Sequence, residues 1–183
     1  KDKMTELALN SIYIGTEGEG IHIGTPQVFV RLRGCAIGCL NCDSMETWDF
    51  QAGSMMTLEQ ILHKVKEQAQ GVMRVSLTGG DPTHPKHEEG ITALAKVLKQ
   101  EGYWLNLEAS GTRVCHELFE TVDFISFDIK PPSTGVRFNP KPLKYVIENF
   151  EEKIQVKSVC ADEADLNMLI DLKGMYTTSA PWC

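Results

Sequence analysis

The chain has 183 residues, 42% of them hydrophobic, with 25 acidic against 18 basic residues and a formal net charge of −7. This length and composition predict a single domain spanning residues 1–183, because no low-complexity linker divides the chain. The acidic balance argues against direct nucleic-acid binding. No apolar run approaches the roughly 20 residues of a membrane span, and the polar start KDKMTELALN is not a signal peptide. We therefore expect a cytoplasmic protein whose partners include neither a nucleic acid nor a membrane.

The first predicted elements are a strand and a helix. QVFVRLR at 27–33 alternates apolar and polar side chains, which predicts a strand. TLEQILHKVKEQAQG at 57–71 begins with Thr57 and has Gln60 three residues later, a capping-box pattern. Its apolar residues then recur at helical spacing, so we expect a helix that ends at Gly71.

The same alternation continues to the end of the chain. Strands are predicted at 72–77, 103–111, 124–132 and 153–159, and helices at 87–102, 112–120, 141–150 and 162–172. Strands that alternate with helices are typical of an α/β fold with a mainly parallel sheet, either open or curled into part of a barrel. In such folds the chemistry gathers where the strands end.

Polar or glycine-rich segments follow four of the predicted strands: RGC, TGGDP, EASGT and DIKPPS. Each segment alone is compatible with a simple turn or strand end. Because the carboxyl ends of parallel strands meet at one edge of a sheet, the four together predict the rim of an active site.

Three cysteines, Cys35, Cys39 and Cys42, form a loop directly after the first predicted strand. Six cysteines allow a disulfide framework, but three clustered in a chain without a signal peptide favour metal binding. Electron-carrying iron–sulfur clusters and structural zinc sites usually have four protein ligands. Three ligands therefore predict an open coordination position where another molecule binds.

The other three cysteines are isolated in the sequence. Isolated cysteines are most often small buried hydrophobes. We therefore predict buried side chains without a chemical role for Cys115, Cys160 and Cys183.

These motifs together resemble a known family. The cysteine spacing and the Gly-Gly-acid-Pro motif of TGGDP are similar to the radical S-adenosylmethionine superfamily. The segments TEGEGIHIGTPQVFVRLRGC, CDSMETWDF, TGGDP, LEASGT and IKPPS resemble, in the same order, the 7-carboxy-7-deazaguanine synthase family. The fold that this resemblance implies is a partial, incomplete TIM-like barrel of the radical S-adenosylmethionine type.

The resemblance also implies the cofactors and the reaction. Cys35, Cys39 and Cys42 would hold three irons of a [4Fe–4S] cluster, and S-adenosylmethionine would chelate the fourth. Reductive cleavage of this cofactor gives a radical that abstracts hydrogen from carbon, which no side chain can do. The implied reaction converts 6-carboxy-5,6,7,8-tetrahydropterin to 7-carboxy-7-deazaguanine with release of ammonia, in queuosine- or archaeosine-type 7-deazapurine biosynthesis. The implied partners are a second copy, as a homodimer, and an electron donor such as flavodoxin or ferredoxin.

The resemblance implies a pterin site at Thr16, Glu17, Gly18, Arg31 and Thr78. The planar guanidinium of Arg31 suits bidentate pairing with the substrate carboxylate, although a surface strand arginine is the alternative. Glu17 stands where the family often has Gln. A carboxylate accepts hydrogen bonds from the amino and ring N–H groups of a pterin but cannot donate any.

Further residues are implied as contacts of the cofactor and of magnesium. Ser44 stands where the family's magnesium ligand usually is Thr, and its alternative role is to cap the turn after the cysteines. Asp128 stands where relatives have Ser. The residues implied to bind S-adenosylmethionine are Asn41, Asp43, Gly80, Glu108, Ser110, Asp128 and Lys130.

Two other functions remain open at this point. A glycyl-radical-enzyme activase has the same cysteine spacing but acts on a protein backbone, so it would not need Arg31 and Ser44. A non-enzymatic iron–sulfur or zinc-binding module predicts a fourth ligand such as His22 or His63. The sequence ends at TTSAPWC, where relatives continue with a Gln-Pro segment. We therefore expect the C-terminal end of the cofactor pocket to be incomplete.

Overall fold

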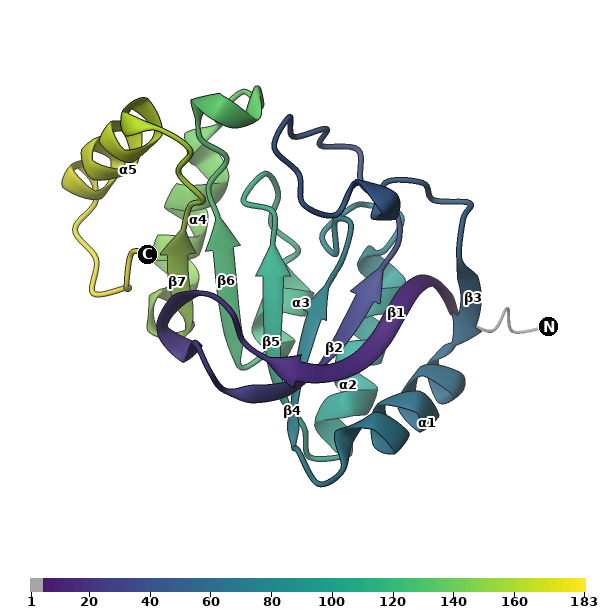
Figure 1. The fold of residues 1–183 in the computed structure, drawn as a ribbon. Helices are drawn as coiled ribbons and strands as arrows, with labels where there is room; N and C mark the ends of the chain where they lie inside the picture. Colours follow the sequence, from purple (N-terminus) through teal and green to yellow (C-terminus); the bar gives the residue numbers. More distant parts are fainter. Residues whose placement is uncertain (1–4) are drawn as a thin grey trace.

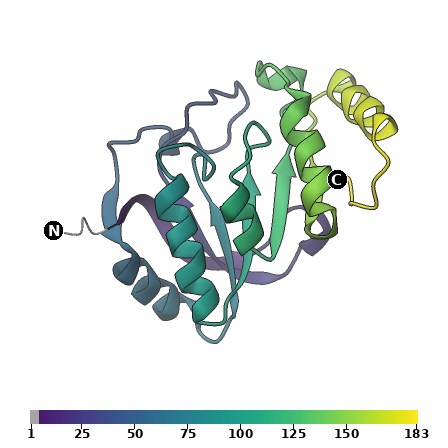
Figure 2. The same ribbon diagram turned by 180° about the vertical axis from the view of Figure 1, so that it is seen from behind.

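The computed structural model describes residues 5–183. A seven-stranded sheet in the order β3-β1-β2-β4-β5-β6-β7 has helices packed along one face (Figure 1, and from behind in Figure 2). The strands are β1 (Glu6–Thr16), β2 (Pro26–Leu32), β3 (Ser54–Thr57), β4 (Arg74–Thr78), β5 (Trp104–Ala109), β6 (Phe124–Asp128) and β7 (Ile154–Lys157).

Five of these strands form the parallel part of the sheet. β2, β4, β5, β6 and β7 pair side by side in the same direction. Val30, Leu77 and Leu107 are register partners on neighbouring strands, and all three are fully buried on the face that the helices cover. The sheet does not close, because β3 and β7 are its two ends. The mainly parallel, partial-barrel fold is therefore confirmed.

The antiparallel edge formed by β1 and β3 is a feature that the sequence patterns did not predict. β1 pairs with β3 and with β2, and its register against β2 shifts between Leu9 and Ser11. Leu7 and Leu9 are buried, whereas Tyr13 beyond the shift is exposed. The irregularity interrupts the alternation of apolar and polar residues, and β3 has only four residues, so neither strand has a clear pattern.

Helices α1 to α4 cover the rear face of the sheet in Figure 1. The predicted capping box is present: Gln60 N donates to the Thr57 side chain, and Thr57 N donates to the Gln60 side chain. One helix begins later than predicted, because Cys115 is still extended before it. The helices are α1 (Leu58–Ala69), α2 (Glu88–Gln100), α3 (His116–Thr121), α4 (Pro140–Phe150) and α5 (Glu163–Met175), with short 3-10 turns η1 (Gly20–His22), η2 (Met45–Thr47), η3 (Pro132–Thr134) and η4 (Glu151–Lys153).

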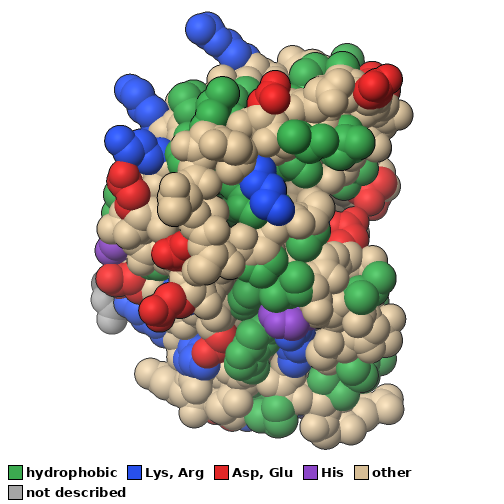
Figure 3. All heavy atoms as spheres, turned by 90° about the vertical axis from the view of Figure 1, so that its left-hand side faces the viewer, with side chains coloured by type: hydrophobic (Ala, Val, Ile, Leu, Met, Phe, Trp, Pro, Cys, Tyr) green, Lys and Arg blue, Asp and Glu red, His purple; other side chains and the backbone are tan. Residues whose placement is uncertain are grey.

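Helix α5 lies beyond β7, at the left of Figure 1. It is tied to η3 by Asp165, whose carboxylate accepts from Ser133 N at 3.0 Å, and to its own preceding loop at Ala161 N, 2.9 Å away. Leu166 and Ile170 of α5 are exposed. Figure 3 shows this side of the molecule, where hydrophobic side chains reach the surface among charged ones.

The last residues of the chain contact the edge strand β7. Near the C-terminal end, Val156 N of β7 donates to Pro181 O at 2.8 Å, and Cys183 N donates to Val156 O at 2.9 Å. These last residues therefore lie along the edge strand β7.

Within residues 5–183, the helices are all too short or too polar to cross a membrane.

Candidate active site

A cleft of about 460 Å³ opens at the carboxyl ends of the parallel strands. Of the predicted site residues, Thr16 alone lies outside it: this last residue of β1 is exposed and pairs with Pro26. The predicted residues that line the cleft are Glu17, Gly18, Arg31, Cys35, Cys39, Asn41, Cys42, Asp43, Ser44, Thr78, Gly80, Glu108, Ser110, Asp128 and Lys130.

The strand register explains how residues far apart in sequence meet in the cleft. Arg31 at the end of β2 is the register partner of Thr78 at the end of β4. Asp128 at the end of β6 is the register partner of Lys157 at the end of β7. The segment between β1 and β2 passes over the sheet face opposite the helices and brings Glu17 to the same cleft (Figure 1).

The loop that contains the cysteines is held against the TGGDP turn. Asp81 N donates to Gly34 O at 2.9 Å, and Gly34 N donates to Thr47 O. A Cβ atom at Gly80 would lie only 2.6 Å from Gly34 O, so a larger residue at Gly80 would push the two segments apart. The structure thus gives Gly80 a packing reason in addition to its predicted contact with the cofactor.

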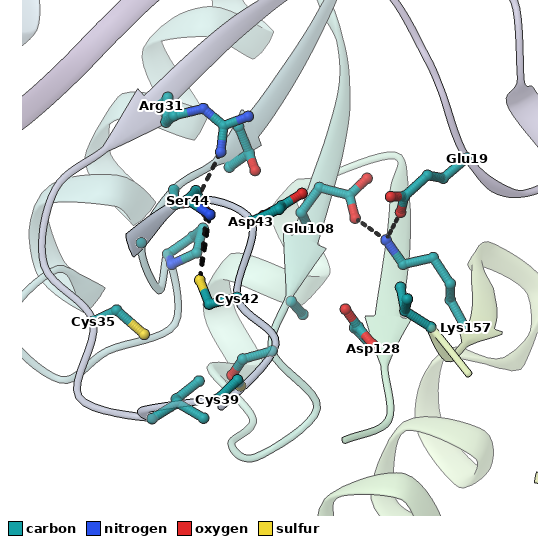
Figure 4. A pocket seen from close by; sticks show the side chains of 18 of the residues that line it. Glu19, Arg31, Cys35, Cys39, Cys42, Asp43, Ser44, Glu108, Asp128 and Lys157 are labelled. Atoms are coloured by element: carbon teal, nitrogen blue, oxygen red, sulfur yellow. Dashed lines mark hydrogen bonds and ion pairs between the residues drawn. The ribbon is translucent and has the colours of Figure 1, made fainter. Parts of the chain in front are cut away.

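The three clustered cysteines are half-buried and lie on one side of the cleft (Figure 4). Trp48 Nε1 donates to Cys42 Sγ at 3.3 Å, and Ser44 N approaches the same sulfur at 3.5 Å. Burial raises the pKa of the Cys35 and Cys39 thiols. Metal binding must therefore drive their deprotonation, and N–H donors on Cys42 would stabilise a thiolate ligand. This donor set fits an iron–sulfur cluster.

The cysteines do not form a site for a single metal ion. Among residues 5–183, no three His, Cys, Asp or Glu side chains converge as ligands of one ion. In an iron–sulfur cubane each thiolate binds a different iron, so this convergence is not required. The proposed fourth ligands also lie elsewhere: His22 packs against Phe124 with ring centroids 4.5 Å apart, and His63 on α1 is exposed beside Glu67.

The isolated cysteines differ from one another. Cys115 is buried, its Sγ donates to Thr83 O at 3.5 Å, and burial raises its pKa to about 11, so it is an inert side chain as predicted. Cys160 and Cys183 are exposed. The prediction that they are buried was wrong, because the loop after β7 and the last residues lie at the surface beside the edge strand.

The opposite side of the cleft contains a cluster of paired charges. Lys157 Nζ contacts Glu108 Oε2 at 3.0 Å and also pairs with Glu19 (Figure 4). Asn106 Nδ2 donates to the other oxygen of Glu108 at 2.9 Å. Burial works against the charge of Lys157, but Glu108 and its acidic neighbours outweigh burial and raise the pKa of Lys157. Lys157 is therefore a cation that is neutralised within the protein.

Sequence reasoning missed Lys157 and Glu19. Lys157 ends the fifth parallel strand, in the mostly apolar segment IQVK, at the same kind of position as the polar ends of the other four strands. That position was the available signal. Nothing in the sequence indicated that Glu19 would reach it.

The other cations of the cleft are held in different ways. Lys130 pairs with Asp128 at 3.1 Å, and this contact keeps the pKa of Lys130 raised in spite of its burial. Arg31 Nη1 donates to Gly79 O at 3.0 Å, and its Nη2 lies 3.4 Å from the Tyr13 hydroxyl. These contacts use two of the five guanidinium N–H donors. Among the described residues, Arg31 has no carboxylate partner.

Ser44 lines the cleft beside the cysteines. It occupies the N-terminal cap position of η2, but its side chain makes no capping hydrogen bond. Its Oγ lies 3.8 Å from Cys42 Sγ, and its carbonyl accepts from Thr47 Oγ1 at 2.7 Å. The structure therefore does not support the alternative role of Ser44 as a turn cap.

Comparisons with known proteins agree with this geometry. Residues 16–125 match the model of the 4Fe-4S single cluster domain. The chain is 35% identical over 156 residues to the 7-carboxy-7-deazaguanine synthase of Pyrobaculum aerophilum, covering 80% of this chain and 69% of that protein. It is 31% identical over 169 residues to the synthase of Bacillus subtilis, covering 87% and 68%. It is 32% identical over 145 residues to the synthase of Aquifex aeolicus, covering 79% and 64%.

Similarity extends to a solved structure. The crystal structure of QueE from Escherichia coli superposes with a TM-score of 0.60 at 18% identity, covering 97% of this chain and 92% of that chain. At this identity the match supports the fold alone. The chain spans about two thirds of the length of the three sequence relatives named above.

Proposed function

The chain belongs to the 7-carboxy-7-deazaguanine synthase family of radical S-adenosylmethionine enzymes, and from this premise we propose that it converts 6-carboxy-5,6,7,8-tetrahydropterin to 7-carboxy-7-deazaguanine with release of ammonia. The observation that carries this proposal is the single cleft that combines three cysteines with Arg31 and Thr78. The product would enter 7-deazapurine biosynthesis.

The first task of the chain is to hold its cofactors. When bound by Cys35, Cys39 and Cys42, a [4Fe–4S] cluster with S-adenosylmethionine supplies the one-electron cleavage that starts hydrogen abstraction. The residues of the cleft position the cofactor and the substrate relative to each other. The turn at Gly80, held against the cysteine loop through Gly34, keeps that loop in place for the cofactor.

The second task is to bind the substrate carboxylate, and the charges of the cleft favour Arg31 for this role. Lys157 already pairs with Glu19 and Glu108, and Lys130 pairs with Asp128. Arg31 is the cation of the cleft that has no carboxylate partner among the described residues, so an incoming carboxylate finds its charge complement there.

Magnesium belongs to the proposal through Ser44. Its hydroxyl lines the cleft on the cysteine side and is not used as a cap. Magnesium often takes one or two protein oxygens and fills its other positions with water and substrate oxygens. Ser44 would supply one such oxygen, and the substrate carboxylate would supply another.

The partners are also proposals. A low-potential donor such as flavodoxin or ferredoxin would supply the electron, and a reducing cytoplasm would keep the cluster thiols free of disulfides. Family membership supports a homodimer, as do exposed apolar side chains on α5 such as Leu166 and Ile170. Light scattering at several protein concentrations would measure the oligomeric state.

The test is anaerobic turnover of the reconstituted protein with dithionite, S-adenosylmethionine, magnesium and the carboxypterin, followed by mass spectrometry. We expect 7-carboxy-7-deazaguanine and 5′-deoxyadenosine. Cleavage of S-adenosylmethionine without any product from the pterin would contradict the proposal and would favour the glycyl-radical activase. In that case an electron paramagnetic resonance signal on a protein substrate would be the result to seek.

A further inference from the structure

A line of three polar side chains runs from Arg74 at the start of β4 to the cleft. Arg74 Nε donates to Gln27 Oε1 at 2.8 Å, and Gln27 Nε2 donates to Glu17 Oε2 at 2.9 Å. Gln27 is completely buried, and Glu17 is 7% exposed where it lines the cleft. The guanidinium of Arg74 stacks on Trp104, with its Cζ 4.1 Å from the ring centroid. We name these three residues, Arg74, Gln27 and Glu17, the relay.

The chemistry of arginine fixes the direction of the relay. A guanidinium has N–H donors and no acceptor, so the carbonyl of the Gln27 amide must face Arg74. The NH₂ group of Gln27 therefore faces position 17 and requires an acceptor there. A carboxylate at Glu17 meets this requirement and leaves its other oxygen, Oε1, for Glu19 N at 3.2 Å.

The backbone of Glu17 is fixed as well. Its N–H donates to Thr25 O at 2.8 Å, and its carbonyl accepts from Gly24 N at 2.7 Å. Both ends of the residue are therefore held, the backbone by the turn and the side chain by Gln27. Each carboxylate oxygen has a second lone pair, so Glu17 keeps capacity to accept from a ligand in the cleft.

We propose that Arg74 and Gln27 are positioning residues that orient the Glu17 carboxylate as an acceptor, so that this part of the cleft selects a ligand edge made of N–H donors. This inference rests on the proposed function, where the amino and ring N–H groups of the pterin would be that edge. The relay has a cost, since Arg74 Nη2 is buried without a hydrogen-bond partner. A purely structural contact with Gln27 would not need a guanidinium that leaves one nitrogen buried and unpaired.

The test exchanges the two ends of one hydrogen bond. Gln27→Glu removes the N–H donor and places a second carboxylate against Glu17. The paired change Glu17→Gln with Gln27→Glu restores the contact in reverse, because the amide at position 17 now donates to the carboxylate at position 27. That carboxylate still accepts from Arg74, and the amide oxygen at position 17 still faces Glu19 N. Thr92→Val, a buried change on α2 far from the relay, is the control.

Four quantities are measured on each reconstituted variant: KM and kcat for the carboxypterin, its equilibrium Kd by calorimetry, and cleavage of S-adenosylmethionine without substrate. Thermal midpoints accompany them. We expect Gln27→Glu to raise KM and Kd about tenfold or more, as for loss of a hydrogen bond to a charged group. Cleavage without substrate should match wild type. The paired change should return KM and Kd to within about threefold of wild type.

Two results would overturn the relay. One is a Gln27→Glu variant whose KM and Kd equal those of Thr92→Val. The other is a paired variant that regains the thermal midpoint but not substrate affinity, which would make the contact purely structural. Wild-type protein that neither binds nor converts the pterin would instead contradict the proposed function. A paired variant whose thermal midpoint is no higher than that of Gln27→Glu would then contradict the relay independently.

Discussion

The two sides of the cleft differ in whether their polar side chains are paired within the protein. On the cysteine side, defined by Cys35, Cys39, Cys42 and Arg31, the thiols and the guanidinium have no charged partner within the described chain. On the lysine side, defined by Glu19, Glu108 and Lys157, every charge is paired inside the protein. Figure 4 shows the cysteines and the charge cluster across the pocket from each other.

This difference indicates which side receives external groups. The half-buried thiols and the Arg31 guanidinium have no ion-pair partner in the described chain, so this side is expected to gain its partners from a cofactor and a substrate. The paired side already satisfies its own groups and has less to gain from a ligand. It therefore serves as a wall that is formed before binding.

The largest effect is expected from breaking the cysteine side. Cys35→Ala, Cys39→Ala or Cys42→Ala should each abolish cluster assembly and turnover, because a cubane with fewer thiolates is not retained. Cluster content by iron analysis and absorption spectroscopy, together with product formation, is the measurement. Cys160→Ala is the control and should assemble a normal cluster, since its exposed thiol lies outside the cleft. Turnover by any one of the three cysteine variants would end the radical interpretation.

Breaking the lysine side should instead lower the stability of the fold. Lys157→Met leaves Glu108 without its cation, and we expect a loss of about 2 to 3 kcal/mol in the free energy of unfolding, less than for a fully buried pair because Glu19 is half exposed. Urea denaturation measures this loss. Lys96→Met is the matched control: its partner Glu117 is mostly exposed, so the cost should stay below about 1 kcal/mol. Equal losses in the two variants would remove the contrast between the two sides.

Arg31→Ala tests the cysteine side at the level of substrate affinity. Binding of the carboxypterin should weaken by about 2 kcal/mol, or roughly 30-fold, because a charged hydrogen-bonded pair is lost. Cleavage of S-adenosylmethionine without substrate should continue. Arg137→Ala, an exposed arginine outside this cleft, should bind the substrate normally. A variant that loses cofactor cleavage but keeps substrate affinity would show that Arg31 has another role.

The cysteine side was the more predictable one from sequence. Its residues lie within one short loop and at the ends of strands that the alternation of apolar residues identifies. Local rules therefore suffice: the spacing of Cys35, Cys39 and Cys42, and the polar strand end TGGDP, which includes Thr78. The capping box at Thr57 was predictable for the same reason.

The lysine side and the relay depend on contacts that no local rule contains. Lys157 and Glu19 are 138 residues apart, and Arg74 and Gln27 are 47 apart. Lys157 and Glu19 meet because the segment after β1 crosses the sheet towards β7, whereas Arg74 and Gln27 meet because β4 pairs with β2, with Val75 opposite Val28. The direction of that segment depends in turn on the antiparallel edge, where the register shift after Leu9 hides the strand pattern.

The pH dependence of Lys157→Met is a smaller effect that sharpens the same comparison. Burial raises the pKa of Glu108, and Lys157 opposes this rise. Without Lys157 the folded-state pKa of Glu108 should increase further, so the folded variant takes up a proton at a higher pH than the unfolded chain does. Its stability then recovers as the pH falls, and the penalty relative to wild type should be smaller at pH 5 than at pH 8. A penalty that is constant over this range in urea denaturation would contradict the pairing.

In the wild type, the shifted pKa of Lys157 links stability to pH over a different range from that of Glu108 in the variant. The pKa of Lys157 is raised in the folded state, so its contribution is fully present below its unfolded value of about 10.4 and is lost only as the pH rises above that value. Between pH 7 and pH 9 the contribution of Lys157 to wild-type stability should therefore stay constant.

The smallest expected effect concerns Ser44 and magnesium, at the edge of the cysteine side. If the hydroxyl binds the cation and the cation binds the substrate carboxylate, magnesium orients the substrate and takes no part in proton transfer. Chelation of divalent ions should lower turnover several-fold and added magnesium should restore it. Ser44→Ala should respond weakly to magnesium, whereas Ser44→Thr should respond as wild type because it keeps the oxygen and adds only a methyl group.

Ser54→Ala, which changes an exposed serine on β3, is the control for this prediction. Because the Ser44 side chain caps no turn, its removal should leave the thermal midpoint unchanged, so a weaker magnesium response without a change in stability identifies a ligand. A Ser44→Ala variant that responds as fully as wild type would show that magnesium, if it acts, binds elsewhere in the cleft.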